Sequence, residues 1–256
     1  MLNTFITTEP NIVNYQDNTN IIEKWQKYWH LHSNLNKQIL HFPLSSIEYN
    51  SDIQLDLTRD FDAVFFISPN AVKSYHNLYK NYIPSKNIWL IGSNSHAIFS
   101  QYYQNADFNV TYIESNKLAN SKNLLSLLNR KNKVFNNQSI LIIKSNLGNN
   151  FIYKELYNQY NANIEYLITY TKIAQKYTQE QLSLLKDIIL KDKRIDIYIS
   201  SSDTLYTWKY YLSNIKNQID FNHNFLHTIY AKYDKIQLKA QEIFSNTHTD
   251  FVLIDK

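Results

Sequence analysis

The sequence lacks several residues on which common active sites depend. It has no cysteine, which excludes disulfides, thiolate nucleophiles and zinc or iron–sulfur sites built on cysteine. Glycine occurs only as Gly92 and Gly148, so neither a GxGxxG dinucleotide loop nor a Walker A loop can form. The only arginines are Arg59, Arg130 and Arg194, and the lysines are dispersed. This pattern does not favour nucleic-acid binding.

Signals for membranes, export and metals are also missing. No segment approaches the ~18 apolar residues that cross a bilayer. The first residues, MLNTFITTEP, have neither the basic region nor the apolar region of a signal peptide, so we expect a cytoplasmic protein that does not bind membranes. The histidines form no HExxH pattern, and no GxSxG elbow occurs. The net charge of +4 allows at most a weak preference for small acidic ligands.

Short apolar runs alternate with segments of helical period, which is typical of parallel sheets covered by helices. Segments 18–32 and 179–191 place apolar residues three and four positions apart, as amphipathic helices do. The ten expected strands are 5–8, 38–41, 63–67, 88–91, 109–113, 139–143, 164–169, 195–199, 225–229 and 251–254. For 256 residues, so many strands fit two domains better than one. The strand-and-helix patterns that begin at Phe61 and Ile195 indicate two related halves.

The turns after these strands carry the candidate binding residues. Ligands of parallel sheets bind beyond the carboxyl ends of the strands, near helix N-termini. The turns 8–10, 68–70, 92–95, 144–148 and 200–202 are rich in Ser and Asn. Such side chains either cap the following helix or help backbone N–H groups to bind the anionic groups of a ligand.

Five strings that contain these turns, read in order, resemble the uroporphyrinogen-III synthase family. They are VFFISPNAV (64–72), WLIGSNSHAIF (89–99), ILIIKSNLGNN (140–150), LITYTKI (167–173) and IYISSSDTL (197–205). Lys144 stands where the family has an arginine, and Gly148 is retained. The sequence departs from the family at Glu9 and at Asn149, where the family has arginines.

The resemblance implies an α/β fold of two lobes, each a parallel sheet flanked by helices, joined by a two-stranded hinge. Residues 1–37 and 172–256 would form a discontinuous domain, and 40–168 an inserted domain. The hinge connectors would lie near 38–43 and 165–172, and the cleft between the lobes would hold the substrate.

The resemblance also implies a reaction. A hydro-lyase of this family converts hydroxymethylbilane into uroporphyrinogen III, with loss of water and inversion of ring D, and needs no metal or organic cofactor. Tyr170 matches the family's tyrosine and is the expected proton donor, because a phenol with a pKa near ~10 is protonated at neutral pH. We expect a monomer. The expected substrate-binding residues are Thr8, Ser68, Pro69, Asn70, Ser93, Lys144, Ser145, Gly148, Asn149, Ser201, Ser202 and Lys232.

Two alternatives stay open at this point. The chain could be a bilobal binding module for a small anion, or an inactive relative of the synthase. Glu9 and Asn149 favour the inactive relative, because each replaces an expected cation.

Overall fold

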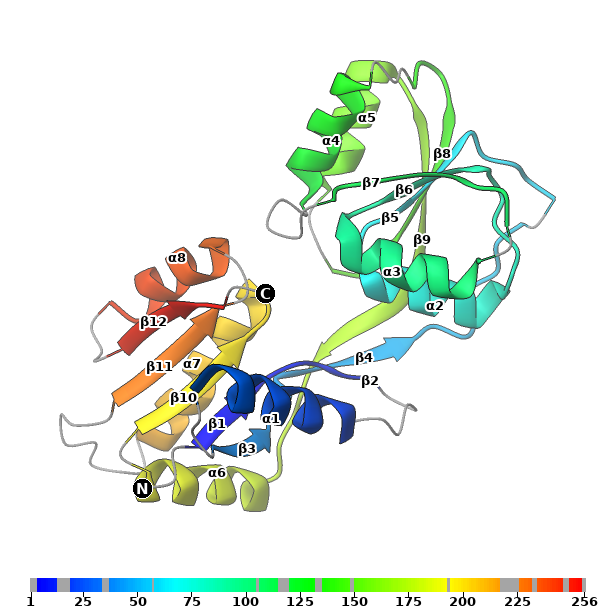
Figure 1. Cartoon of the computed structure of the whole chain (residues 1–256). Coiled ribbons are helices and arrows are strands. Elements are labelled where there is room, and N and C mark those ends of the chain that lie inside the picture. The colour runs from blue at the N-terminus through cyan, green and yellow to red at the C-terminus, as the bar shows by residue number, and fades with distance from the viewer. Residues whose placement is uncertain are drawn as a thin grey trace. The chain divides into compact units, whose positions relative to one another are not determined.

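The computed structural model describes residues 4–12, 19–33, 37–56, 58–104, 106–114, 120–131, 135–147, 150–192, 194–216, 226–231, 234–245 and 249–254 (Figure 1). The chain divides into unit 1, Met1–Ile47 with Ile173–Lys256, and unit 2, Glu48–Lys172. The chain passes between the units twice, in strand β4 (Ser45–Tyr49) and strand β9 (Asn163–Ala174).

Unit 1 contains a five-stranded sheet in the order β12-β11-β10-β1-β3, whose neighbouring strands all pair in parallel (Figure 1). Its strands are β1 (Thr4–Thr7), β3 (Gln38–His41), β10 (Arg194–Ile199), β11 (Leu226–Ala231) and β12 (Thr249–Leu253). Its helices are α1 (Thr19–Ser33), α6 (Gln179–Lys191), α7 (Ser202–Lys216) and α8 (Asp234–Ile243). The short β2 (Asn11–Ile12) pairs with β4.

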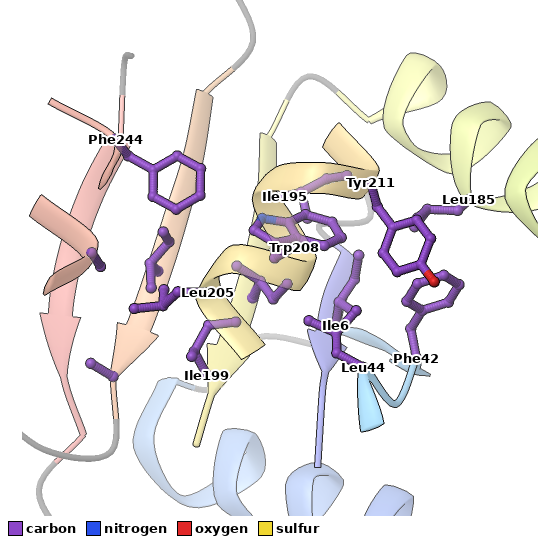
Figure 2. Close-up of a cluster of buried hydrophobic side chains, with 14 of the residues drawn as sticks. Ile6, Phe42, Leu44, Leu185, Ile195, Ile199, Leu205, Trp208, Tyr211 and Phe244 are labelled. Carbon is purple, nitrogen blue, oxygen red and sulfur yellow. The ribbon is translucent and has the colours of Figure 1, made fainter. Parts of the chain in front are cut away.

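Successive apolar residues of these strands point to opposite faces and fill both faces of the sheet. Helices α6, α7 and α8 cover one face, and Figure 2 shows Trp208 of α7 lying close to Ile195 and Ile6. Trp208 is completely buried. The other face packs Phe5 and Tyr198 against Trp25 and Trp29 of α1, with ring centroids 4.4 Å apart for Trp25 and Tyr198. Burial of both faces explains why the strands read as continuous apolar runs.

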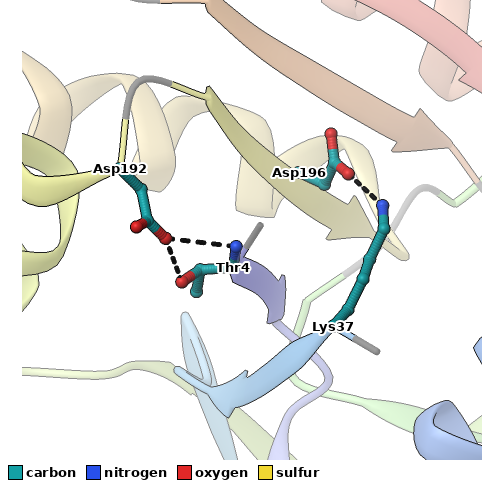
Figure 3. A network of polar contacts seen from close by, with 4 residues as sticks. All are labelled: Thr4, Lys37, Asp192 and Asp196. Carbon is teal, nitrogen blue, oxygen red and sulfur yellow. Dashed lines mark hydrogen bonds and ion pairs between the residues drawn. The ribbon is translucent and has the colours of Figure 1, made fainter. Parts of the chain in front are cut away.

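Buried polar contacts tie the amino ends of the strands in unit 1 (Figure 3). Lys37, just before β3, forms an ion pair with Asp196 of β10, and the two side chains are 4% and 2% exposed. The Lys37 ammonium also lies 3.6 Å from the ring centroid of Trp29. Thr4 donates from its backbone N–H, at 3.1 Å, and from its hydroxyl to the Asp192 carboxylate.

Unit 2 carries most of the second sheet, whose order is β2-β4-β9-β8-β5-β6-β7. Its further strands are β5 (Ala63–Phe66), β6 (Asn87–Leu90), β7 (Asn109–Tyr112) and β8 (Ser139–Ser145). Its helices are α2 (Pro69–Tyr79), α3 (Gly92–Tyr102), α4 (Ser121–Arg130) and α5 (Phe151–Tyr160). Helices α4 and α5 pack on the face that contains Phe65, whereas Phe66 contacts Tyr75 of α2 and Phe99 of α3 on the other face.

These elements confirm the α/β class and the ten expected strands, and they correct the first connector. Segment 38–43 was expected to join the domains, but residues 38–41 form β3 and pair in parallel with β1 inside unit 1. The division lies between Ile47 and Glu48, within β4, rather than near residue 40. Strand β4 has the sequence SSIEY, in which only Ile47 is aliphatic, so its composition gave little strand signal. Hydrogen bonds from Asn50 N to Thr169 O and from Gln175 N to Leu44 O flank the β4–β9 pair.

Candidate functional site

The turn after β5 shows how the sequence builds a helix start at the carboxyl edge of the unit 2 sheet. Ser68 has an extended backbone, and its Oγ accepts a hydrogen bond of 3.0 Å from the backbone N–H of Ala71. Pro69 occupies the first helical turn, where a missing N–H costs nothing. Ser68 is therefore the N-cap of α2, and the sequence SPNA fixes where this helix begins.

Tyr170 of β9 lies against the same turn. Its phenol oxygen is 2.8 Å from Ser68 Oγ, and Ser145, whose hydroxyl donates to Leu147 O at 2.7 Å, lies near enough to lower the pKa of the phenol. Tyr170 pairs with Ser145 across a register shift in the β8–β9 ladder, and the backbone N–H of Asn146 donates to Tyr170 O. The residue is only 7% exposed. Ser68, Ser145 and Tyr170 thus form a cluster of three hydroxyls, which we name the hydroxyl cluster.

The hydroxyl cluster suits proton donation. Burial raises the pKa of Tyr170 above its ordinary value near ~10, and the hydrogen bonds from Ser68 and Ser145 oppose this shift. The phenol is therefore protonated at neutral pH. Because Ser68 Oγ already accepts from Ala71, it can also donate its own proton to the phenol oxygen. That arrangement leaves the Tyr170 proton free for a ligand and stabilises the phenolate after transfer.

A second hydroxyl pair fastens α2 to β9 beside Tyr170. Ser74 Oγ lies 2.6 Å from Thr169 Oγ1, and both residues are completely buried. Ser74 Oγ also donates to Asn70 O at 2.7 Å, so the Thr169 hydroxyl donates to Ser74. The pair fixes the helix that carries Ser68 relative to the strand that carries Tyr170.

Lys144 has different surroundings from Ser145, although the two are adjacent. Its side chain is 5% exposed, and Nζ donates to Asn150 Oδ1 at 3.2 Å. The ring of Tyr166 lies 4.8 Å from Nζ. Burial lowers the pKa of the ammonium. Lys144 therefore does not belong to the hydroxyl cluster.

The β6–α3 turn departs from the expected capping. Helix α3 begins at Gly92, which has a φ of 81° and so adopts a left-handed conformation that favours glycine. The N-cap is Ile91, which has no capping side chain, and Ser93 lies inside the first turn. Ser93 is therefore not the N-cap, and its partly exposed side chain lies at the carboxyl edge of the sheet beside the β5 turn.

In unit 1 the expected binding turns follow the neighbouring strands β1 and β10. Thr8 is completely buried and donates to Tyr198 O at 2.6 Å, so its hydroxyl is used within the fold. Thr204 Oγ1 donates to Ser201 O at 2.6 Å and stabilises the start of α7, where Ser201 and Ser202 are partly exposed. Of the expected site residues, Gly148, Asn149 and Lys232 lie outside the described residues.

Glu9 forms an ion pair with a lysine of the following helix. Its carboxylate lies 2.6 Å from Lys24 Nζ, and the two side chains are 20% and 50% exposed respectively. Glu9 also raises the pKa of His41, although burial of His41 has the larger, lowering effect. The carboxylate of the turn after β1 is therefore paired with a cation of α1.

Sequence reasoning missed four residues that shape these sites: Ser74, Thr169, Asn150 and Tyr166. Two of them stood inside the quoted strings, Thr169 directly before Tyr170 and Asn150 at the end of ILIIKSNLGNN. Ser74 gave a weaker signal, as a small polar residue on the buried side of α2.

Within the described ranges, no group of three or more His, Asp and Glu residues could hold a metal ion. The helices of those ranges are also too short or too polar to cross a membrane. What the fold provides is a set of hydroxyls at strand ends and of backbone N–H groups at helix starts.

The fold and these turns define an α/β protein in which an inserted parallel-sheet unit interrupts a second one. The family model described as uroporphyrinogen-III synthase HemD matches residues 31–225. The chain belongs to the uroporphyrinogen-III synthase family, whose enzymes are lyases of tetrapyrrole biosynthesis.

Two known proteins are similar to the chain. A protein of Methanocaldococcus jannaschii, provisionally named a uroporphyrinogen-III synthase, is 24% identical over 173 residues. That alignment spans 66% of this chain and 66% of the relative, slightly less than two thirds of its length. The crystal structure of uroporphyrinogen-III synthetase from Helicobacter pylori 26695 matches 100% of this chain and 93% of that chain, with a TM-score of 0.58 and 14% identity. This structural likeness shows the shared fold.

Proposed function

We propose that the chain is an active uroporphyrinogen-III synthase. It would cyclise hydroxymethylbilane with inversion of ring D and release water. The observation that supports this proposal is the hydroxyl cluster, in which Tyr170 is buried, protonated and 2.8 Å from Ser68 at the carboxyl edge of a sheet. Family membership supplies the substrate, and the cluster supplies the group that the first step needs.

Tyr170 would act where the hydroxymethyl group of ring A leaves. Hydroxide is a poor leaving group, so a proton donor accelerates cleavage of the C–O bond. The hydroxyl takes the Tyr170 proton and departs as water, while the bilane keeps the positive charge as an azafulvenium cation. Ser68 then donates to the phenolate. A proton lost from the closing macrocycle restores the phenol, so the protein needs no metal or organic cofactor.

The larger task for the protein is positioning. Hydroxymethylbilane closes without help to the isomer with an uninverted ring D, so catalysis consists mainly of holding the chain for attack by the substituted carbon of that ring. We propose that the substrate carboxylates bind backbone N–H groups at helix starts. The contributing turns contain Pro69, Asn70, Ser93, Ser201 and Ser202. Because the donors are in the main chain, truncating any one of these side chains should change turnover little.

A coupled assay tests the proposal. Bilane is generated enzymatically in the same vessel, and the uroporphyrinogen isomers are separated by chromatography. We expect an excess of isomer III with the wild type and at least a several-fold lower turnover for Tyr170→Phe. The control is Tyr157→Phe, which removes a 52% exposed phenol from α5 and should change nothing. Isomer I alone would support a binding module or an inactive relative instead, and an unchanged kcat for Tyr170→Phe would remove the phenol from the mechanism.

A further inference from the structure

Asn50, directly after β4, makes three hydrogen bonds to the segment of β9 that contains Tyr170. Its backbone N–H donates to Thr169 O at 3.1 Å, and its Nδ2 donates to Ile168 O at 2.7 Å. Its Oδ1 accepts from the Thr171 hydroxyl at 3.1 Å. One asparagine therefore holds the residues on both sides of Tyr170.

These bonds act where the pairing of β9 is irregular. The β8–β9 ladder shifts register between Lys144 and Ser145, and Ser145 then pairs with Tyr170. A register shift interrupts the repeating backbone hydrogen bonds that otherwise fix the position of a residue and the direction of its side chain. The place of the Tyr170 phenol therefore depends on contacts other than the regular ladder.

Asparagines supply such contacts from both sides of β9. The strand lies between β4 and β8, and an asparagine follows each of these neighbours. Asn146, after β8, donates from its backbone N–H to Tyr170 O at 3.2 Å, and its Oδ1 accepts from Lys172 N at 3.1 Å. Asn50 binds the same segment from the β4 side. The backbone that carries the phenol is thus fixed from both neighbouring strands.

We propose that Asn50 is a positioning residue for the Tyr170 phenol, an inference whose catalytic part rests on the proposed function. Its side chain holds the backbone of residues 168–171, so that the phenol oxygen stays 2.8 Å from Ser68 Oγ. A hydrogen bond weakens steeply as its geometry departs from the ideal, and a shift of about 1 Å at a reacting group can cost about 10²-fold in rate. Asn50 therefore acts on proton donation through Tyr170.

The kinetic test compares Asn50→Ala with a matched control, Asn87→Ala, in the full chain. Asn87 lies at the amino edge of the same sheet, where its Nδ2 donates to Asp62 O and its Oδ1 accepts from Asn109 Nδ2. Each substitution therefore removes one hydrogen bond to a backbone carbonyl and one from a side chain. In the coupled bilane assay, the kcat of Asn50→Ala should fall at least about threefold, by no more than Tyr170→Phe lowers it, with KM within about twofold of wild type. Asn87→Ala should leave both constants unchanged.

The coupling between Asn50 and Tyr170 separates positioning from a general loss of structure. In a double-mutant cycle, adding Asn50→Ala to Tyr170→Phe should lower kcat by less than about 1.5-fold, because no phenol proton remains to be positioned. A merely structural effect lowers kcat by the same factor in both backgrounds. Equal factors in the two backgrounds, or a wild-type kcat for Asn50→Ala, would overturn the inference.

A smaller change keeps the test valid if Asn50→Ala does not fold. Thr171→Val removes only the hydroxyl that donates to Asn50, and it then replaces Asn50→Ala in the cycle with the same expected results. Thr171→Ser keeps that hydroxyl and should keep the wild-type kcat. A fall in kcat for Thr171→Ser equal to that for Thr171→Val would show that the hydrogen bond is not responsible.

The environment of the phenol is also measured without substrate, which separates this inference from the proposed function. In protein labelled with 13C at the Cζ of tyrosine, the Tyr170 NMR signal is the one that Tyr170→Phe removes. This signal should shift in Asn50→Ala, because the hydrogen bond to Ser68 changes, and should keep its position in Asn87→Ala. If the wild type forms only isomer I, the synthase proposal fails, and the spectrum alone decides whether Asn50 positions the phenol. If isomer III forms but the signal and kcat of Asn50→Ala match the wild type, the synthase proposal holds and the inference is wrong.

Discussion

Breaking the ion pair between Lys37 and Asp196 should strongly destabilise unit 1. The two side chains are 4% and 2% exposed, and Lys37 also lies on the face of Trp29. Replacing Asp196 with Leu leaves the Lys37 ammonium buried without its counter-ion. Replacing Lys37 with Met likewise leaves the Asp196 carboxylate buried without its counter-ion. Either change should therefore cost far more than the loss of an exposed pair.

The expected magnitude follows from burial of both charges. Removing one partner of a buried pair typically costs about 3–5 kcal/mol, because the remaining charge stays desolvated. At roughly 2–4 °C per kcal/mol for a chain of this size, the midpoint of unit 1 should fall by about 10 °C. The double replacement Lys37→Met with Asp196→Leu removes both charges and should cost less than about 1 kcal/mol.

A double-mutant cycle in urea, followed by tryptophan fluorescence, measures these differences. Lys86→Met is the control, because Lys86 and Asp107 are 75% and 98% exposed and form a pair of 3.6 Å. That variant should be indistinguishable from the wild type. The reasoning is refuted if either single variant loses less than about 1 kcal/mol, or if the double variant loses the sum of the two.

Three further predictions concern buried polar groups. Ser74→Ala should cost about 1–3 kcal/mol by leaving the Thr169 hydroxyl unpaired, whereas adding Thr169→Val should recover most of the loss in urea unfolding; an equal or greater loss would contradict this. Burial lowers the pKa of His227 to about 4. Between about pH 6.5 and pH 4 this histidine is therefore protonated in the unfolded chain but neutral in the folded chain. Stability should therefore be constant above about pH 7 and fall by up to about 3 kcal/mol toward pH 4, and His227→Leu should flatten this slope; an unchanged slope would exclude His227 as its source. Because the pKa of Tyr170 is raised, the ratio of wild-type to Tyr170→Phe turnover should stay constant from about pH 7 to about pH 9, and a falling ratio would show that the phenol ionises in that range.

The parts of the fold that followed from sequence are those whose signals are local. Helix α6 begins at Gln179, and its N-cap Thr178 forms a capping box with Gln181 in the first turn. The helix runs to Lys191, as its apolar spacing predicts. Strand β10 is buried on both faces, and its four apolar residues among six, three of them isoleucine, marked it as a strand despite Asp196. By contrast, β4 has few apolar residues and lies between β2 and β9, so its place depends on a strand far along the chain.

The site was predicted in its parts rather than in its contacts. Ser68, Ser145 and Tyr170 were each expected at strand ends, but their convergence depends on the β5-β8-β9 order and on the register shift beside Ser145. Local composition carries no information about a contact between residues 68 and 170. Thr8 is an expected site residue only because it lies in a turn after a strand. Its hydroxyl is buried and donates to Tyr198 O. Backbone turns follow from short strings, whereas side-chain partners need the tertiary fold.

The isomer composition made from enzymatically generated bilane tests the central claim most directly. With the hydroxyl cluster intact, the wild type should give mainly the macrocycle with inverted ring D, and the same protein with Tyr170→Phe should give a smaller share of it in equal time. A wild-type product identical to that of the spontaneous reaction would contradict the account.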